Sequence, residues 1–388
     1  MRVPLELSLD VSAVPVHPGG AGYYTMALAR GLASHPHVAL TLVARRGDTA
    51  RWHDLAGGSP CRDAVPASRP GRLAFEQLGL PKLLRSVGAS LHHGPHYTMP
   101  ERSPIPCAVT IHDCTFFDHP EWHRRSKAAF FRRAIRRAAQ RAAVLICVSQ
   151  TTAERLHANC PVRAPVVVAP HGVDHTRFTP DEPAAGADRA ALASLGIPDQ
   201  RPLVVFVGTL EPRKGVASLV AAFDRIAGAD PDVVLVLGGQ AGWGLEATER
   251  ALGAARHRDR VVRTGYLPGA TVPALLRRAA AAAYPALEEG FGLPALEAMA
   301  CAAPLVTTEG TAMAEFAADA ALLVPPGDVD ALADALRRAL LEGRNTPRTA
   351  RGLAVAAEHT WEATVRRILR LAGIAPEDGL VPAIGAAS

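Results

Sequence analysis

The stretch Tyr284-Pro-Ala-Leu-Glu-Glu-Gly-Phe-Gly-Leu-Pro-Ala-Leu-Glu-Ala-Met-Ala300 combines a strand end, a glycine-bearing turn and the start of a helix. Pro294 suits the first turn of a helix, because its missing N–H would be unpaired there and its φ is already helical. The helix is therefore predicted to begin near Leu293. Backbone N–H groups from Gly290 to Gly292 then face outward, and the helix dipole favours an anion. Parallel α/β sheets bind ligands at such junctions.

Two carboxylates, Glu289 and Glu297, frame this turn. Beside a phosphate site, a carboxylate is suited to accept hydrogen bonds from hydroxyl groups, as the acidic residue of dinucleotide folds does from a ribose. The pattern thus favours a ligand that carries both phosphate and hydroxyl groups. The alternative is that Glu297 is a first-turn glutamate favoured by the helix dipole and Glu289 is a solvated loop residue.

A second junction of the same kind lies upstream. A buried strand from Leu203 ends at Gly208, and the turn that follows carries Arg213 and Lys214 before a new helix. Two adjacent cations at a strand's carboxyl end could neutralise a diphosphate, arginine by its fork and lysine as a point charge. Only three of the 42 basic residues are lysines, so Lys214 stands out. The alternative is a solvated basic turn.

Composition limits the class of protein. A chain of 388 residues with 48% hydrophobic and 20% charged residues is typical of a soluble globular protein with two domains. No apolar run approaches 18 residues, and Glu6 and Asp10 stand where a signal peptide needs an apolar core, so a cytoplasmic protein is expected. The six cysteines form no C-x-x-C pair, which favours reduced core thiols over zinc or disulfides. A net charge of +5 permits an anionic partner.

The N-terminal half offers weaker signals. A strand from Leu5 to Leu9 runs into a loop containing Gly19 and Gly20, where a backbone without side chains can approach a phosphate. A nicotinamide site or a plain turn would also explain these glycines. Residues 48–70 are polar and are predicted to form a loop.

A strand ending in His112 and Asp113 would deliver a neutral imidazole to the ligand-binding edge of the sheet. The alternative is a strand-end histidine that is solvated or bonded to the backbone. His92, His93 and His96 lie nearby, but they have no acidic or cysteine partner at metal-ligand spacing.

From Arg124 to Arg141, eight of eighteen positions are basic and none is acidic, while apolar residues recur at helical spacing. This pattern predicts a basic amphipathic helix. Such a helix can touch an anionic membrane surface, and a helix packed by its apolar face on the protein surface is the alternative. Nucleic-acid binding through the same helix is a further alternative, which the shortage of stacking aromatics disfavours.

The segment Glu289-Gly-Phe-Gly-Leu-Pro-Ala-Leu-Glu297, with Pro285 before it, resembles the signature of the group 1 (family 4) retaining glycosyltransferases. The turn with Arg213 and Lys214 is a second match. The resemblance covers nearly the whole chain, although Thr209 and His171 replace an arginine and an asparagine that are common in the family.

The resemblance implies α/β architecture of the GT-B type, two Rossmann-like doubly wound parallel-sheet domains facing a cleft. Residues 1–180 would form the acceptor-side domain and residues 181–359 the nucleotide-sugar domain, with a helix in 360–388 crossing back. The implied catalytic residues are His112, Arg213, Lys214 and Glu289. The implied donor site comprises Gly19, Gly20, Gly208, Arg213, Lys214, Tyr266, Gly290, Phe291, Gly292, Leu293 and Glu297, with no cofactor and no metal ion.

By this resemblance the protein would transfer a hexosyl unit, mannose or glucose, from a nucleotide diphosphate sugar to an acceptor hydroxyl with retention at the anomeric carbon. The acceptor would be a glycan, a lipid-linked molecule or a natural product, and no nucleic acid is expected as a partner. A sugar-nucleotide epimerase on the same two-domain plan is the alternative enzyme.

Overall fold

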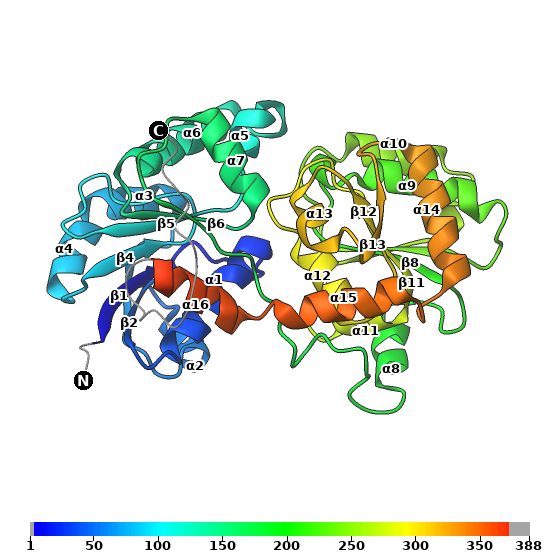
Figure 1. Cartoon of the computed structure of the whole chain (residues 1–388), viewed down its shortest axis with the longest axis horizontal. Coiled ribbons are helices and arrows are strands. Elements are labelled where there is room, and N and C mark those ends of the chain that lie inside the picture. The colour runs from blue at the N-terminus through cyan, green and yellow to red at the C-terminus, as the bar shows by residue number, and fades with distance from the viewer. Residues whose placement is uncertain (1–3, 372–388) are drawn as a thin grey trace.

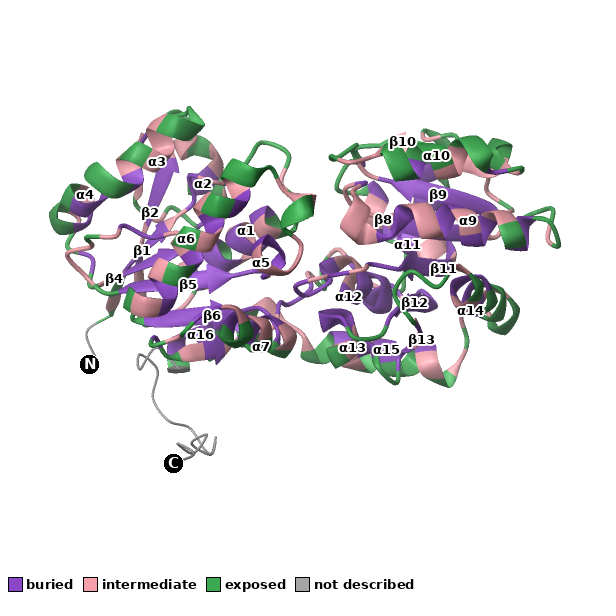
Figure 2. Ribbon diagram, turned by 90° about the horizontal axis from the view of Figure 1, so that it is seen from above, coloured by how far each residue is buried: buried purple, intermediate pink, exposed green. Residues whose placement is uncertain are grey.

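The computed structural model describes residues 4–371, which form two α/β domains side by side (Figure 1). Each domain has one sheet, and every strand pair in both sheets is parallel. Because helices cover both faces of such sheets, the central strands β5 (Cys107–Ile111), β6 (Val144–Cys147), β9 (Val234–Gly238) and β12 (Leu305–Thr308) are buried along their whole length. The edge strands β3 (Cys61–Val65) and β10 (Val261–Gly265) keep exposed polar residues. Figure 2 shows this directly, with buried strands inside and exposed surfaces on the outer helices. The predicted fold class is confirmed.

The first sheet has seven strands in the order β3-β2-β1-β4-β5-β6-β7. Its strands are β1 (Leu5–Asp10), β2 (Val38–Arg45), β3 (Cys61–Val65), β4 (Leu91–Gly94), β5 (Cys107–Ile111), β6 (Val144–Cys147) and β7 (Val166–Val168). The helices around it are α1 (Gly20–Ala33), α2 (Thr49–Leu55), α3 (Arg69–Leu78), α4 (Leu80–Ser86), α5 (Thr115–Asp118), α6 (Arg125–Arg141), α7 (Gln150–Asn159) and α16 (Trp361–Leu371), with the 3-10 turn η1 (Pro120–Trp122).

The second sheet has six strands in the order β10-β9-β8-β11-β12-β13. Its strands are β8 (Leu203–Val207), β9 (Val234–Gly238), β10 (Val261–Gly265), β11 (Ala279–Tyr284), β12 (Leu305–Thr308) and β13 (Ala321–Val324). Its helices are α8 (Ala187–Ala193), α9 (Val216–Ala227), α10 (Glu246–Ala254), α11 (Thr271–Arg278), α12 (Leu293–Ala300), α13 (Ala312–Ala317), α14 (Val329–Glu342) and α15 (Pro347–Glu358), with the 3-10 turns η2 (Pro212–Lys214) and η3 (Arg258–Arg260).

Two sequence predictions for the first domain are wrong. Residues 48–70 do not form one loop, because they contain α2, the edge strand β3 and the start of α3. The fully buried Trp52 anchors α2 in the core, and this single residue outweighs the polar composition around it. The glycine segment is also not a free loop, since α1 already begins at Gly20 with Gly19 as its N-cap.

The chain crosses between the domains twice. It passes forward after β7 and returns after α15, so that α16 completes the first domain (Figure 1). Val365, Ile368 and Leu369 of α16 are buried in the first domain's core. Gly31 of α1 lies directly under Val365, and a Cβ atom at position 31 would clash with that side chain. Helix α16 thus packs on the first domain, and residues 372–388 of the range 360–388, in which the sequence predicts a helix that crosses back, lie outside the described residues.

The two crossings lie against each other. Gly172 approaches the backbone of Thr360 and Trp361 so closely that no side chain would fit, and the amide of Val173 donates to the carbonyl of His359 over 3.0 Å. Thr364 adds a 2.7 Å hydrogen bond to the carbonyl of Pro170. This double crossing fixes the segment around His171 at the boundary between the domains.

Candidate active site

A cleft of about 410 Å³ lies between the domains, at the carboxyl ends of both sheets. It brings together all the residues that the sequence singled out as a site: Gly19, Gly20, His112, Gly208, Arg213, Lys214, Tyr266, Glu289, Gly290, Phe291, Gly292, Leu293 and Glu297. The two junctions of the second domain, one with Arg213 and Lys214 and one with Glu289, lie next to each other in this cleft.

The turn that carries Arg213 and Lys214 meets the turn that carries Glu289, and both cations bind the Glu289 carboxylate. Arg213 Nη1 lies 3.2 Å from Glu289 Oε2, and Lys214 Nζ pairs with the same oxygen. Glu211, which no sequence motif marks as a site residue, binds the guanidinium from the other side, with Arg213 Nε 2.6 Å from Glu211 Oε1. Gly215 has φ +68°, and any side chain there would strike the carbonyl of Pro285. The glycine therefore allows the two turns to touch.

The two cations keep Glu289 ionised. Burial alone would raise the pKa of this carboxyl, but the charges of Lys214 and Arg213 outweigh it and hold the pKa at about 2. Glu289 is therefore a hydrogen-bond acceptor at neutral pH and cannot serve as a general acid. A diphosphate that binds Arg213 and Lys214 would share these two cations with the Glu289 carboxylate.

Helix α12 begins at Leu293, as predicted, directly after Gly292. Gly292 has φ +99°, a conformation open to glycine, and a Cβ there would clash with Met313. Further along the helix, Glu297 borders the cleft and a neighbouring cavity of about 680 Å³. Burial raises the pKa of Glu297 to about 8, which Arg177 opposes, so this carboxyl is largely protonated at neutral pH without a ligand.

His112 follows β5 and is buried at the floor of the cleft. Its Nε2 lies 2.8 Å from the carbonyl oxygen of Pro95. Burial lowers the pKa of His112, so the ring is neutral at neutral pH. A carbonyl can only accept, so Nε2 carries the proton and Nδ1 remains an acceptor. The ring can thus receive a hydrogen bond from a ligand hydroxyl.

His171, which stands where an asparagine is common in the family that the sequence resembles, lines the cleft. It is 4% exposed, and neither of its ring nitrogens has a hydrogen-bond partner among the described residues. The ring stacks on Tyr24 at 4.9 Å between centroids and lies 4.7 Å from the ring of Phe291. Burial lowers the pKa of His171 well below its ordinary value. A buried polar group without a partner is costly, and a ligand hydroxyl in the cleft would satisfy it.

The remaining predicted donor residues, Gly19, Gly20, Gly208 and Tyr266, also line the cleft. Gly19 and Gly20 stand at the start of α1, and a Cβ on either would meet open space. Steric demand therefore does not explain these two glycines. Gly208 adopts φ +155° after β8. Tyr266 is 43% exposed, with its ring 4.8 Å from that of His17 in the first domain.

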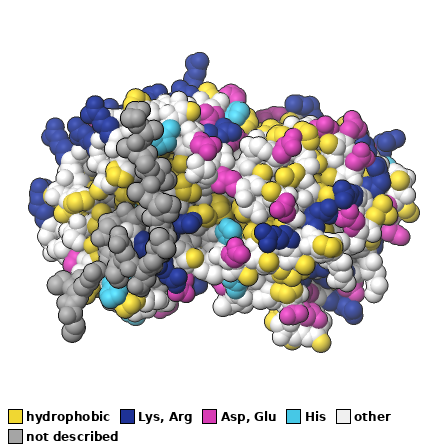
Figure 3. Space-filling view, in the orientation of Figure 1, with side chains coloured by type: hydrophobic (Ala, Val, Ile, Leu, Met, Phe, Trp, Pro, Cys, Tyr) yellow, Lys and Arg dark blue, Asp and Glu magenta, His cyan; other side chains and the backbone are white. Residues whose placement is uncertain are grey.

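The basic helix α6 turns its apolar residues inward, where Ala128, Phe131, Ile135, Ala138 and Ala139 are buried. Some of its arginines make intramolecular contacts: Arg132 donates to the carbonyl of Phe116 over 2.6 Å, and Arg133 pairs with Glu101 at 2.8 Å. Figure 3 shows other basic side chains on the surface of this domain. Within residues 4–371, no helix combines the length and apolar character needed to cross a membrane.

The histidines near β4 have structural partners. His92 Nδ1 lies 3.2 Å from Ser8 Oγ, and His93 Nε2 lies 2.8 Å from Thr110 Oγ1. His96 lines the cleft instead. In the part of the chain that the structure describes, no group of three or more His, Cys, Asp or Glu side chains is arranged to hold a metal ion.

The chain is similar in sequence to known glycosyltransferases. O-antigen chain mannosyltransferase B of Escherichia coli is 28% identical over 284 residues, which are 72% of this chain and 73% of that protein. A D-inositol 3-phosphate glycosyltransferase of Actinosynnema mirum is 34% identical over 221 residues, which are 54% of this chain and 52% of that protein. The match therefore spans about half the length of this second relative.

Solved structures share the fold. A sucrose-phosphate synthase of Thermosynechococcus elongatus superposes with a TM-score of 0.74 at 22% identity, covering 95% of this chain and 98% of that chain. Anabaena Alr3699/HepE, solved in complex with UDP-glucose, gives a TM-score of 0.74 at 18% identity, with 94% and 98% covered.

Both halves of the chain match family models. Residues 188–354 match the model of glycosyl transferases group 1, and residues 18–177 match that of glycosyltransferase family 4. The first match contains Arg213, Lys214, Glu289 and Glu297. The second match contains His112. Sequence, fold and cleft agree, and the chain belongs to the group 1 (family 4) glycosyltransferases.

Proposed function

We propose that this protein transfers a hexosyl unit from a nucleotide diphosphate sugar to an acceptor hydroxyl with retention at the anomeric carbon. The observation that carries the proposal is the meeting of Arg213, Lys214 and Glu289 at one point of the cleft. This site offers two cations for a diphosphate and an ionised carboxylate for sugar hydroxyls, side by side. Mannose or glucose is the proposed sugar, which agrees with the mannosyltransferase relative and with the UDP-glucose complex of HepE.

In the proposed reaction, Arg213 and Lys214 stabilise the charge that develops on the leaving diphosphate, and the start of α12 adds its dipole. Retaining glycosidases use two carboxylates across the scissile bond. Glu289 is instead bound by two cations, so we propose substitution from the face of the leaving group, whose oxygen takes the acceptor proton. Glu289 positions the sugar, Glu297 holds the ribose, and His112 supports the sugar ring.

The first experiment screens UDP-glucose, GDP-mannose, GDP-glucose and UDP-N-acetylglucosamine for thermal stabilisation. The stabilising donor is then incubated with candidate acceptors, and NMR determines the anomeric configuration of the product. A product with inverted configuration would contradict the proposed mechanism. Because cations and a helix end supply the charge in this proposal, EDTA should leave transfer unchanged, and a loss that Mg²⁺ restores would show that a metal is needed.

An epimerase would use the same cleft but form a different product. Donor incubated alone should release nucleotide slowly if water acts as acceptor, and an acceptor should accelerate the release. Conversion of the donor to an epimer, or nucleotide release that no acceptor changes, would favour the epimerase.

A further inference from the structure

Helix α7 of the first domain contacts the loop that carries Glu289. The hydroxyl Oγ1 of Thr152 lies 3.2 Å from the carbonyl oxygen of Gly290 and 3.4 Å from that of His112. Ser149, the N-cap of α7, holds this hydroxyl in place with a 2.9 Å hydrogen bond. One side chain of α7 thus lies between the donor loop and the strand end that carries His112.

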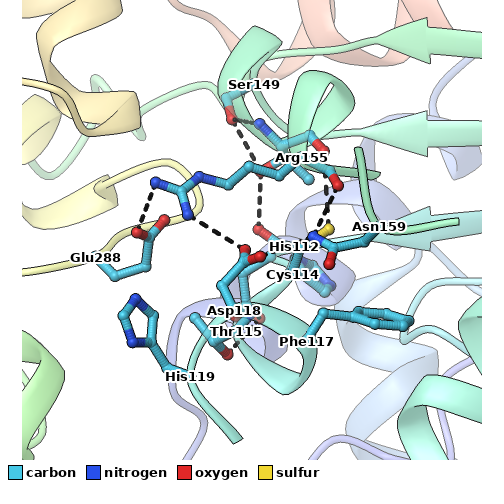
Figure 4. A network of polar contacts seen from close by, with 12 residues as sticks. His112, Cys114, Thr115, Phe117, Asp118, His119, Ser149, Arg155, Asn159 and Glu288 are labelled. Atoms are coloured by element: carbon cyan, nitrogen blue, oxygen red, sulfur yellow. Dashed lines mark hydrogen bonds and ion pairs between the residues drawn. The ribbon is translucent and has the colours of Figure 1, made fainter. Parts of the chain in front are cut away.

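One turn further along α7, Arg155 reaches across the domain boundary (Figure 4). Its Nη2 lies 2.8 Å from Glu288 Oε2, and its Nη1 lies 3.2 Å from Asp118 Oδ2 in the first domain. Asn159, also on α7, donates to the other oxygen of Asp118 over 2.7 Å. The Glu288 side chain is only 6% exposed, and it directly precedes Glu289. A planar guanidinium can bind two carboxylates at once, which a lysine ammonium on the same helix could not do with the same geometry.

The second domain also contacts the first turn of α7. Both carboxylate oxygens of Glu315, in α13, accept hydrogen bonds from the backbone, at 2.9 Å from the amide of Gln150 and 2.6 Å from that of Thr151. Amides in the first turn of a helix have no partner within the helix, so a carboxylate satisfies them well. Helix α7 is therefore bound by the second domain at its start and at its middle.

We infer that Glu288 and Arg155 are positioning residues for glycosyl transfer: their ion pair fixes the loop 288–292 on α7 and so holds Glu289 at its place in the cleft, which His112 also lines. This inference rests on the proposed function. Neither residue needs to touch the substrate. Glu288 acts through the peptide bond to Glu289, and Arg155 acts through Glu288, with Asp118 and Asn159 holding the guanidinium.

The test compares wild type with Glu288→Gln, Arg155→Ala, Arg155→Lys and the double variant Glu288→Gln/Arg155→Ala in the full chain. UDP-glucose and GDP-mannose are the donor probes, with hydrolysis of the donor as the reaction. We expect kcat to fall about 10- to 100-fold in the two single variants, because a small misplacement of reacting groups has that effect. Nucleotide affinity should change less than about threefold, because the proposed nucleotide contacts Arg213, Lys214 and Glu297 all lie in the second domain. The double variant should lose no more than the single ones, and Arg155→Lys should recover part of kcat.

A matched control is the buried ion pair between Arg277 and Asp188, which lies within the second domain at 2.7 Å, with side chains 8% and 9% exposed. Asp188→Asn should lower the melting temperature without changing kcat at a temperature where the protein is folded. If Glu288→Gln behaved like this control, the pair would be merely structural and the inference wrong.

Small-angle X-ray scattering supplies a readout that needs no turnover. Arg155→Ala should have a larger radius of gyration than wild type, and the control variant should not. If wild type turned over no donor probe and bound no nucleotide, the proposed function would fail, whatever the scattering showed. If wild type were active and the Glu288 and Arg155 variants matched it in both kcat and radius of gyration, the inference alone would fail.

Discussion

Gly290 of the second domain lies against the backbone carbonyl of His112 in the first domain, so closely that a Cβ atom on Gly290 would approach that oxygen to less than 3.0 Å. The Cβ atom of Asp113 would lie 3.2 Å from the same added atom and leaves little more room. From its sequence, Gly290 is predicted to belong to the donor site, where its amide would face an anion. The structure gives this glycine a second task, since its missing side chain allows the domains to meet at the cleft.

Gly290→Ala should therefore separate the donor loop from His112. We expect kcat for transfer to fall about 100-fold, while nucleotide affinity stays within about threefold, because the nucleotide groups of the second domain keep their places. Steady-state kinetics and nucleotide titration check this. Gly253→Ala is the control, because Gly253 lies in helix α10 and a Cβ atom at this position would meet open space. It should stabilise the protein by about 0.5–1 kcal/mol without loss of activity.

Glu289→Gln should separate catalysis from nucleotide binding. The amide keeps the shape of the side chain but no longer neutralises Lys214 and Arg213. We expect kcat to fall about 100-fold or more, since a charged group of the site is lost, while UDP or GDP binds as tightly as before or more tightly. Isothermal titration and initial rates measure the two effects. Equal losses in both would contradict the assigned role of Glu289, and Glu249→Gln, which removes an exposed ion pair with Arg263, should change neither.

Glu297→Gln should show an effect on stability that depends on pH. Burial raises the folded-state pKa of Glu297 to about 8, above its ordinary value of 4.5, so this carboxyl favours folding most below pH 4.5. That contribution is lost as pH rises to about 8, because the unfolded chain releases the proton first. Near pH 4.5 the glutamine variant should have the same free energy of unfolding as wild type. By pH 8 its free energy of unfolding should exceed that of wild type by on the order of 1–3 kcal/mol, a figure reduced for solvent screening of the carboxylate. Denaturant melts at several pH values test this, and a gain that did not grow with pH would refute it.

His171→Phe should raise stability and lower activity together. The phenyl ring can still stack with Tyr24 and Phe291, and the cost of two unpartnered ring nitrogens, about 1–3 kcal/mol, disappears. If a sugar or acceptor hydroxyl normally satisfies these nitrogens, kcat/KM should fall by about tenfold or more. Thermal melts and initial rates measure both. Unchanged kcat/KM would mean that no ligand contacts the ring.

The parts of the cleft that the sequence predicted are those whose local pattern fixes their position. Pro294 places the start of α12, and a strand followed by a basic turn places Arg213 and Lys214 at the edge of the second sheet. Parallel sheets collect such turns at one edge, which is why Glu289 and the two cations lie near each other.

The rest depends on contacts between segments far apart in the chain. Nothing in the local sequence of Arg155 indicates that it pairs with Glu288, because the pair joins two domains. Trp52 likewise anchors α2 in a segment whose composition favours a loop, since packing in the core overrides local propensity. The need for a glycine at position 290 follows from the close approach of the first domain and not from the conformation of the turn itself.

The return of α16 to the first domain has a consequence for synthesis on the ribosome. Val365, Ile368 and Leu369 leave the exit tunnel last among the described core residues of that domain, after every strand of the second sheet. The nascent first domain must therefore wait with the surface of α1 uncovered while the later domain is translated.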